Sequence, residues 1–224
     1  MGFPLNDSCG RMLQKLTQLR PEWGVAAVVD TETTGLDPRR HEVLEVAVVL
    51  FAFDRYSGHV YGVVDEYSGL REPRRPIPKA VQRVHGISDE HVRGCRLNEE
   101  RINALLSAAE FIVSHNASFD YAFLSRLFPA ITSKHWLCSM NGVAWYRRGH
   151  KSKSLGALLR DHGVSVANAH RALDDARATL LLLSLPGPTG HPNLSDLVRC
   201  IPWDRVGRQS RPGVSARNGT VHGS

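Results

Sequence analysis

Cysteine is scarce in this chain of 224 residues, and its four copies are scattered: Cys9, Cys95, Cys138 and Cys200. No C-x-x-C pair occurs, so we expect no zinc site. The scattered positions also give no disulfide framework, which suits a reducing compartment. The sequence therefore predicts a cytoplasmic protein that carries neither structural zinc nor disulfides.

Long apolar runs, internal repeats and a signal-peptide core are missing as well. We therefore expect no membrane partner. The chain is 42% hydrophobic and 22% charged, which is ordinary for a globular protein with a sizeable core. Its net charge of +6 at pH 7 favours an anionic partner, and nucleic acid is one such class.

Composition divides the chain into three parts. Residues 1–23 are expected to form an N-terminal extension with a docked helix, because apolar residues recur there at helical spacing; a transit peptide is the alternative. Residues 24–185 are expected to form one domain. Over residues 186–224, where Pro, Gly, Ser and Arg prevail, five arginines stand against two aspartates. This composition predicts a basic, disordered tail.

The order of expected elements indicates the fold class. Apolar runs predict strands over residues 24–30, 43–53 and 60–67, joined by short links as in an antiparallel meander. Helical and strand patterns then alternate, with helices expected over 78–84, 99–109, 118–128, 154–161 and 171–185 and strands over 111–114 and 136–138. The sequence therefore predicts an α/β protein with a mixed five-stranded sheet flanked by helices.

Two acidic residues, Asp30 and Glu32, stand at the end of the first expected strand. Residues two apart on a strand project to the same face, so their carboxylates lie side by side and repel unless a cation lies between them. Carboxylate oxygens suit Mg²⁺ or Mn²⁺. The pair predicts a metal site, and a solvated strand end is the alternative.

Further acids follow later in the chain. Asp120 enters a helix after a short strand, where helix capping is the alternative role. His170 precedes a helix that carries Asp174 and Asp175 near its start. One helical step turns by about 100°, so only one of these two acids can face a shared site. We expect it to be Asp175, which lies on the face that carries small, packed residues.

With these motifs in this order, the chain resembles the DEDDh (DnaQ-like) 3′→5′ exonucleases, a family that includes the proofreading epsilon subunit of bacterial DNA polymerase III. The motifs are Asp30-Thr-Glu-Thr-Thr-Gly35, His115-Asn-Ala-Ser-Phe-Asp120, and His170 followed five residues later by Asp175. The segment 77–88 also looks like the family's sequence between the first two motifs. The resemblance covers roughly residues 24–185.

The resemblance implies a ribonuclease-H-like fold and two divalent cations, Mg²⁺ or Mn²⁺. Carried over position by position, it implies that Asp30 bridges both cations. Glu32 and Asp175 would hold the first cation, and Asp120 the second. His170 would be the general base, a role that suits a histidine near neutral pH. The implied partners are single-stranded DNA 3′ ends and a DNA polymerase.

Four residues near these motifs are candidates for substrate contacts. In similar enzymes an apolar residue at the position of Leu36 wedges against terminal bases; turn packing is the alternative. The backbone of Thr33 is expected near the terminal nucleotide. Asn116 is a candidate for bonding substrate or backbone, with a turn role as the favoured alternative. Phe119 is a candidate for stacking on bases, with a place in the core as the favoured alternative.

Other features have less specific interpretations. His85 is expected to brace the Thr-Thr-Gly turn, and Glu45, inside an apolar strand, has no expected role. Two basic loops, 71–75 and 146–153, are candidates for holding nucleic acid, and the second is favoured because Trp145 and its neighbour Tyr146 adjoin cations. Solvated loops are the alternative for both.

The leading hypothesis is a metal-dependent 3′→5′ exonuclease that releases nucleoside monophosphates from DNA 3′ ends in proofreading or repair. One alternative keeps the chemistry and takes RNA or short oligonucleotides. Another is a catalytically idle binding module, which should have lost an acid or the histidine; none of them is missing.

Overall fold

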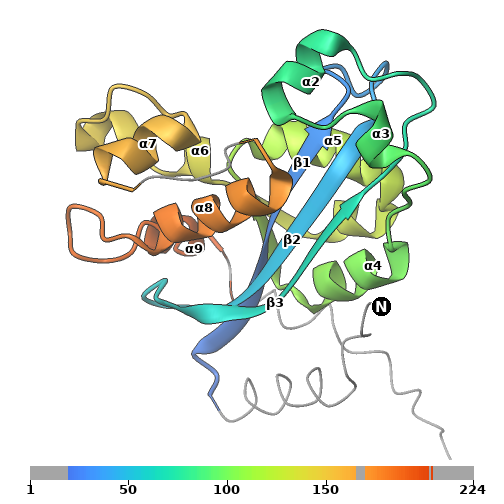
Figure 1. Cartoon of the computed structure of the whole chain (residues 1–224). Coiled ribbons are helices and arrows are strands. Elements are labelled where there is room, and N and C mark those ends of the chain that lie inside the picture. Colours follow the sequence, from blue (N-terminus) through green and yellow to red (C-terminus); the bar gives the residue numbers. More distant parts are fainter. Residues whose placement is uncertain (1–19, 165–169, 202, 204–224) are drawn as a thin grey trace, which may run out of the picture.

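A computed structural model of the chain describes residues 20–164, 170–201 and 203. Its centre is a five-stranded sheet in the order β3-β2-β1-β4-β5 (Figure 1). β1 is antiparallel to β2 and parallel to β4. The mixed α/β sheet expected from the sequence is therefore confirmed.

The first three strands form the expected meander. β1 (Trp23–Thr33), β2 (Val43–Asp54) and β3 (Val60–Leu70) pair in antiparallel register. Their β-branched and aromatic residues favour extended backbone and pack on both faces of the sheet. β1 is longer than expected and continues through the acidic motif, with Glu32 opposite Glu45 on β2.

The later part of the chain alternates helices and strands. β4 (Phe111–Ser114) and β5 (His135–Cys138) extend the sheet in parallel. The helices are α2 (Lys79–His85), α3 (Asp89–Val92), α4 (Glu99–Ala108), α5 (Ala117–Leu127), α6 (Ser139–Gly142), α7 (Leu155–Asp161), α8 (Ala172–Ser184) and α9 (Leu194–Val198), with 3₁₀ turns η1 (Pro129–Ser133) and η2 (Trp145–Arg148). The five helices expected from the sequence are all present, within a few residues at each end.

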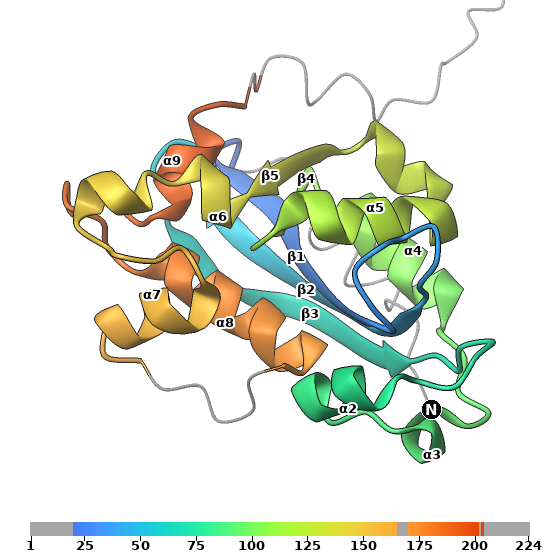
Figure 2. The same ribbon diagram turned by 90° about the horizontal axis from the view of Figure 1, so that it is seen from above.

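Helices cover both faces of the sheet (Figure 2). Val25, Ala27 and Val29 of β1 pack with α4 and α5, whereas Ala26 and Val28 pack with α7, α8 and α9. This alternation follows from the two-residue period of a strand. Asp30 and Glu32 continue the second set, so they lie on the face that α8 covers.

The expectation of a disordered tail from residue 186 is wrong for the described part. α9 buries Leu194, Leu197 and Val198 against the same core as α8, and Ile201 joins them. These four apolar side chains bury enough surface to order the segment, although its overall composition is polar. The expected extension at residues 1–19 and the remainder of the tail, 204–224, lie outside the described residues. Within the described residues, no helix is long and apolar enough to cross a membrane.

Candidate metal and catalytic site

Three carboxylates meet where β1 passes under the start of α8. Asp30 and Glu32 come from β1, and Asp175 comes from the first turn of α8. One oxygen from each of the three lies within 4.8 Å of the others. The strand period and one helical turn therefore bring together acids that are about 145 residues apart in sequence.

The packed acids resist simultaneous ionisation. Burial raises the pKa of Asp30 well above its usual value, and neighbouring carboxylates raise it further, Asp120 first and then Asp175 and Glu32. Burial and the same repulsion raise the pKa of Glu32 to about 8. Burial also raises the pKa of Asp175, which the backbone N–H of His170 partly offsets. Removing this stored repulsion requires either protons or a cation.

Asp120 reaches the site from the opposite face of β1. It lies in the first turn of α5, is buried, and accepts a 2.9 Å hydrogen bond from the hydroxyl of Thr31. Thr31 stands between the two acids of β1 and points the other way, so Asp120 adjoins the cluster without entering its 4.8 Å group. Burial raises the pKa of Asp120 to about 7, against several hydrogen bonds that lower it.

His170 stands directly before α8 with an exposed side chain. Its backbone N–H donates to Asp175 Oδ2 at 3.2 Å. Its φ of 70° is the single positive φ of a non-glycine residue in the described part of the chain. Such a conformation costs about 1–3 kcal/mol, so surrounding contacts must hold it. Asp174, the rejected acid, does not join the group of three carboxylates.

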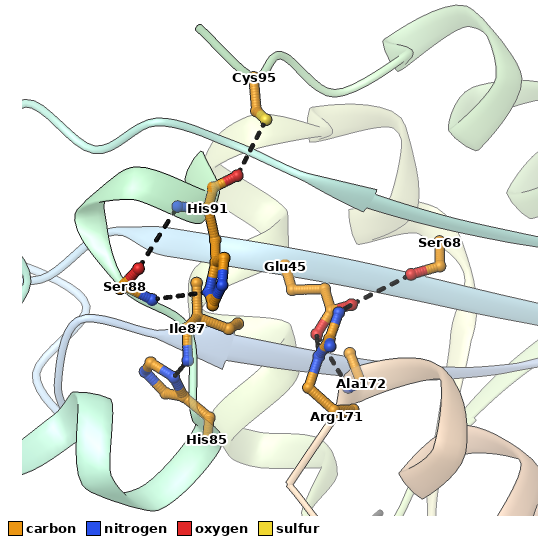
Figure 3. Close-up of polar contacts among 9 residues, drawn as sticks. All are labelled: Glu45, Ser68, His85, Ile87, Ser88, His91, Cys95, Arg171 and Ala172. Carbon is orange, nitrogen blue, oxygen red and sulfur yellow. Dashed lines mark hydrogen bonds and ion pairs between the residues drawn. The ribbon is translucent and has the colours of Figure 1, made fainter. Parts of the chain in front are cut away.

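The segment that follows His170 is held by Glu45, for which the sequence predicts no role (Figure 3). Its carboxylate receives two hydrogen bonds from the Arg171 guanidinium, at 3.0 and 2.9 Å. It also accepts from the backbone N–H of Ala172 at 3.1 Å and from the Ser68 hydroxyl at 3.2 Å. No side chain of its own caps α8. Glu45 therefore acts as a cap supplied by β2, which fixes the start of α8 beside the acids.

The Thr-Thr-Gly turn after β1 is held from within. Thr33 donates its hydroxyl to the Gly35 carbonyl at 2.7 Å, and Glu42 donates its N–H to the Thr34 hydroxyl at 3.0 Å. Gly35 has φ +157, and a Cβ there would lie 2.6 Å from the His41 ring, so glycine is required. The turn leaves Leu36 82% exposed at its tip.

His85, the last residue of α2, is buried, and Figure 3 shows its side chain next to Ile87. Its Nδ1 accepts from the Ile87 N–H at 3.0 Å. Burial lowers the pKa of His85, and Glu45 and the Thr33 backbone partly oppose that effect. Nε2 has no hydrogen-bond partner among the described residues. The bracing of the Thr-Thr-Gly turn by His85 stays a prediction, which the effect of the Thr33 backbone on the His85 pKa supports.

The other substrate candidates divide between surface and core. Asn116 is exposed, and its side-chain oxygen accepts from the Ser118 hydroxyl at 3.2 Å, a local turn bond. Phe119 is half-buried and packs against Phe123, with ring centroids 5.0 Å apart. Phe123 is buried. Phe119 thus packs at the edge of the core, as the favoured alternative expects, and keeps a partly open face.

The basic loop 146–153, the favoured candidate for holding nucleic acid, makes structural contacts together with the adjoining Trp145. Trp145 is 0% exposed and donates its indole N–H to the Ser139 carbonyl at 2.8 Å. Arg148 forms a 2.5 Å ion pair with Asp196 next to α9. Trp145 is therefore not available for stacking on bases. Tyr146 stays exposed, with the Lys153 ammonium 5.0 Å from its ring centroid.

The donor set suits a hard divalent cation. All three clustered side chains are carboxylates, the oxygen ligands that Mg²⁺ and Mn²⁺ prefer. No thiol or imidazole belongs to the group. Their mutual repulsion makes the site more stable when positive charge is present. Asp30, Glu32 and Asp175, with Asp120 adjoining, could therefore hold metal.

Comparison with known proteins finds similarity over most of the chain. The RNase T family model, described as exonuclease, matches residues 27–183. The PolC-type DNA polymerase III of Thermotoga petrophila is 34% identical over 166 residues, which are 68% of this chain and 11% of that polymerase. The epsilon subunit of DNA polymerase III from Treponema pallidum is 30% identical over 168 residues, which are 69% of this chain and 73% of that subunit. This chain thus spans about a tenth of the PolC-type relative.

The fold also matches a solved nuclease. Exonuclease I superposes with a TM-score of 0.61 at 22% identity, covering 77% of this chain and 42% of that one. The structure of the E. coli enzyme with a dT13 oligonucleotide gives a TM-score of 0.58 at 20% identity, covering 72% and 40%. At this identity the likeness concerns the fold, a mixed sheet flanked by helices.

Proposed function

Because this chain belongs to the RNase T exonuclease family, we propose that it is a metal-dependent 3′→5′ exonuclease that releases nucleoside monophosphates from DNA 3′ ends. The observation that carries the proposal is the meeting of Asp30, Glu32 and Asp175 within 4.8 Å, with Asp120 beside them. These are the four acids of the DEDDh motifs. The catalytically idle alternative has no support, because no member of the set is lost.

In this proposal the four acids hold two divalent cations, Mg²⁺ or Mn²⁺. When bound, such cations supply an activated water and stabilise the anionic transition state and the leaving oxygen. Asp30 is the proposed bridging ligand, as the family resemblance implies, and it lies between Asp175 in the group of three carboxylates and Asp120, both of which raise its pKa. Glu32 and Asp175 complete the first site, and Asp120 approaches the second from the far face of β1.

His170 is the proposed general base. Its imidazole is exposed beside Asp175, and its backbone is fixed by the bond to that residue. A histidine can take a proton near neutral pH, a contribution worth about 10²–10⁴-fold in rate. Glu45 holds Arg171, the residue after His170, through two hydrogen bonds, and this keeps the proposed base near the acids.

The proposed substrate is single-stranded DNA with a free 3′ end. Leu36, exposed at the tip of the turn, would wedge against a terminal base, and the backbone of Thr33 would lie beside the terminal nucleotide. Asn116 and the open face of Phe119 line the start of α5 next to Asp120. The dT13 complex of exonuclease I and the polymerase names of the two relatives support DNA. RNA remains the second candidate substrate, since the family match by itself names no sugar.

A DNA polymerase is the proposed protein partner, because the relatives are a PolC-type polymerase and a polymerase subunit. A cytoplasmic location belongs to the same proposal. Cys95, Cys138 and Cys200 are free thiols in the described residues, which supports a reducing compartment.

A degradation assay tests the function. The full chain is incubated with 5′-labelled single-stranded DNA, double-stranded DNA or RNA, in Mg²⁺, Mn²⁺ or EDTA. We expect a ladder shortened from the 3′ end, fastest on single-stranded DNA, and none in EDTA. Asp30→Ala is the matched inactive variant. If it keeps more than about a tenth of the wild-type rate, the proposed metal site is wrong.

A further inference from the structure

A hollow lined by arginines lies beside the C-terminal half of α5, whereas Asp120 lies in the first turn of this helix. Its volume is about 570 Å³. The six arginines that line it form what we term the arginine groove: Arg39, Arg40, Arg71, Arg74, Arg75 and Arg126. They come from the loop after β1, the loop after β3 and α5.

The groove is connected to the acidic site by α5. Leu127 lines the groove and follows Asp120 by seven residues, which is two helical turns. The two residues therefore share a face of α5, about 10 Å apart along its axis. The Arg126 guanidinium donates to the Pro38 carbonyl, which fixes the loop after β1 against the helix. Figure 2 shows this loop, in blue, beside α5.

The arginine groove contains more positive charges than carboxylates to pair with them. Glu42 is the one carboxylate that lines it among the described residues, and it lies 3.6 Å from the Arg71 guanidinium. Arg39 pairs with Asp37 at 3.2 Å. The other four arginines are exposed and form no ion pair with any described carboxylate: Arg40, Arg74, Arg75 and Arg126.

Keeping like charges together costs free energy unless an anion is bound. A fold that needed these arginines for internal pairing alone would place carboxylates among them, as it does for Arg55 with Glu110 and Arg101 with Asp65. A second hollow of about 530 Å³ shares Arg71 and Arg74, and its lining also includes the carboxylates of Glu72 and Glu99. The excess of positive charge therefore belongs to the arginine groove, whose six guanidiniums suit a chain of anions better than one small anion.

We propose that the arginine groove binds the phosphodiester backbone of nucleic acid outside the scissile position, either upstream on the cleaved strand or on a complementary strand. This inference rests on the proposed function for its substrate class. Guanidinium groups bind phosphate oxygens in a fixed fork geometry. Because Leu127 at the groove lies about 10 Å from Asp120 along α5, a strand whose 3′ end is at the acids must extend past the scissile position to reach the groove.

Binding in EDTA tests the groove without relying on hydrolysis. Anisotropy of fluorescein-labelled DNA is measured with the full chain for a single-stranded tetranucleotide, a single-stranded 20-mer and a duplex with a recessed 3′ end. The test variant is Arg74→Gln/Arg75→Gln. The matched control is Arg160→Gln/Arg199→Gln, which removes two exposed arginines from α7 and the end of α9. Thermal melting of both variants checks that they fold.

For the test variant we expect affinity for the 20-mer to fall about tenfold, and the slope of log Kd against log salt to become shallower by about 1.4. The affinity of the test variant for the tetranucleotide should change little, because so short a strand does not reach the groove. Loss on the single strand assigns the groove to the cleaved strand; loss on the duplex alone assigns it to the complement. Equal losses in test and control variants, or no loss on either long substrate, would overturn the proposal. A wild-type chain that binds these strands but hydrolyses none with Mg²⁺ or Mn²⁺ would defeat the proposed function and leave the groove supported.

Discussion

Glu45 on β2 and Arg171 at the start of α8 are 126 residues apart in sequence, yet they form an ion pair through two hydrogen bonds. The Glu45 carboxylate is only 2% exposed, whereas the Arg171 side chain is 46% exposed. The same carboxylate caps the N–H of Ala172. One buried group thus fixes the segment that carries His170 and leads into Asp175.

Glu45→Gln should therefore lower both stability and turnover. Glutamine keeps the shape of the side chain but has no negative charge. The charge-assisted hydrogen bonds from Arg171 are therefore lost, and a bond of this kind is worth about 1.5–3 kcal/mol. We expect a lower melting temperature and a kcat reduced by at least about tenfold, with KM less affected. The control is Glu66→Gln, which breaks the exposed ion pair between Glu66 on β3 and Arg177 on α8. Equal effects of the two substitutions would mean that Glu45 has no positioning role.

Stability of the metal-free protein should fall as pH rises. The pKa of Glu32 is raised from 4.5 to about 8, so between these values the folded chain binds more protons than the unfolded chain. The free energy of unfolding then decreases with rising pH across this window and levels off above it. Asp120, with a pKa raised to about 7, acts in the same direction.

Melting temperatures in EDTA over about pH 5 to pH 9 measure this effect. Glu32→Gln should flatten the fall, and Mg²⁺ should stabilise the wild type more strongly at the higher pH, where the carboxylates are ionised. A wild-type profile parallel to that of Glu32→Gln would contradict the assignment.

Asp175→Asn should be far more damaging than Asp174→Asn. Asp175 shares the group of three carboxylates, and Asp174, one helical step away, does not. Single-turnover rates with saturating Mn²⁺ compare the two directly. We expect a loss of more than about a hundredfold for Asp175→Asn and less than about threefold for Asp174→Asn. A larger loss at Asp174 would show that the wrong acid has been chosen.

His170→Ala should cost about 10²–10⁴-fold in kcat while Mn²⁺ binding survives, because general-base catalysis contributes that much. The wild-type rate on a chromogenic phosphodiester should rise with pH toward neutrality, and the variant should lose that rise. Isothermal titration of the variant with Mn²⁺ shows whether His170 acts as a general base or as a metal ligand. Affinity that drops as steeply as in Asp30→Ala would make His170 a metal ligand instead.

Truncation after Leu185 should prevent stable folding. It removes α9 with Leu194, Leu197 and Val198, each of which contributes about 1.5–3 kcal/mol by burial. Truncation after Trp203 keeps these contacts and should leave turnover of a short oligonucleotide unchanged. Circular dichroism melts and the short-substrate assay compare the two chains. A folded, active chain ending at Leu185 would show that α9 is dispensable.

The sheet and the pair of acids on β1 could be predicted without a structure, because both depend on local periodicity. Apolar runs marked all five strands, and the two-residue period of a strand placed Asp30 and Glu32 on one face. The helical step of about 100° likewise selected Asp175 over Asp174. These rules act within a few residues, so they can be read without a fold.

Roles that depend on distant partners could not be predicted before the fold was known. Glu45 had no local explanation, since its partner Arg171 is brought to it by the packing of α8 on β2. Trp145 looked like a surface aromatic until its burial against the core was seen. The arginine groove gathers three segments that sequence spacing does not connect. Long-range packing and electrostatics are set by which surfaces meet, and that is a property of the folded chain.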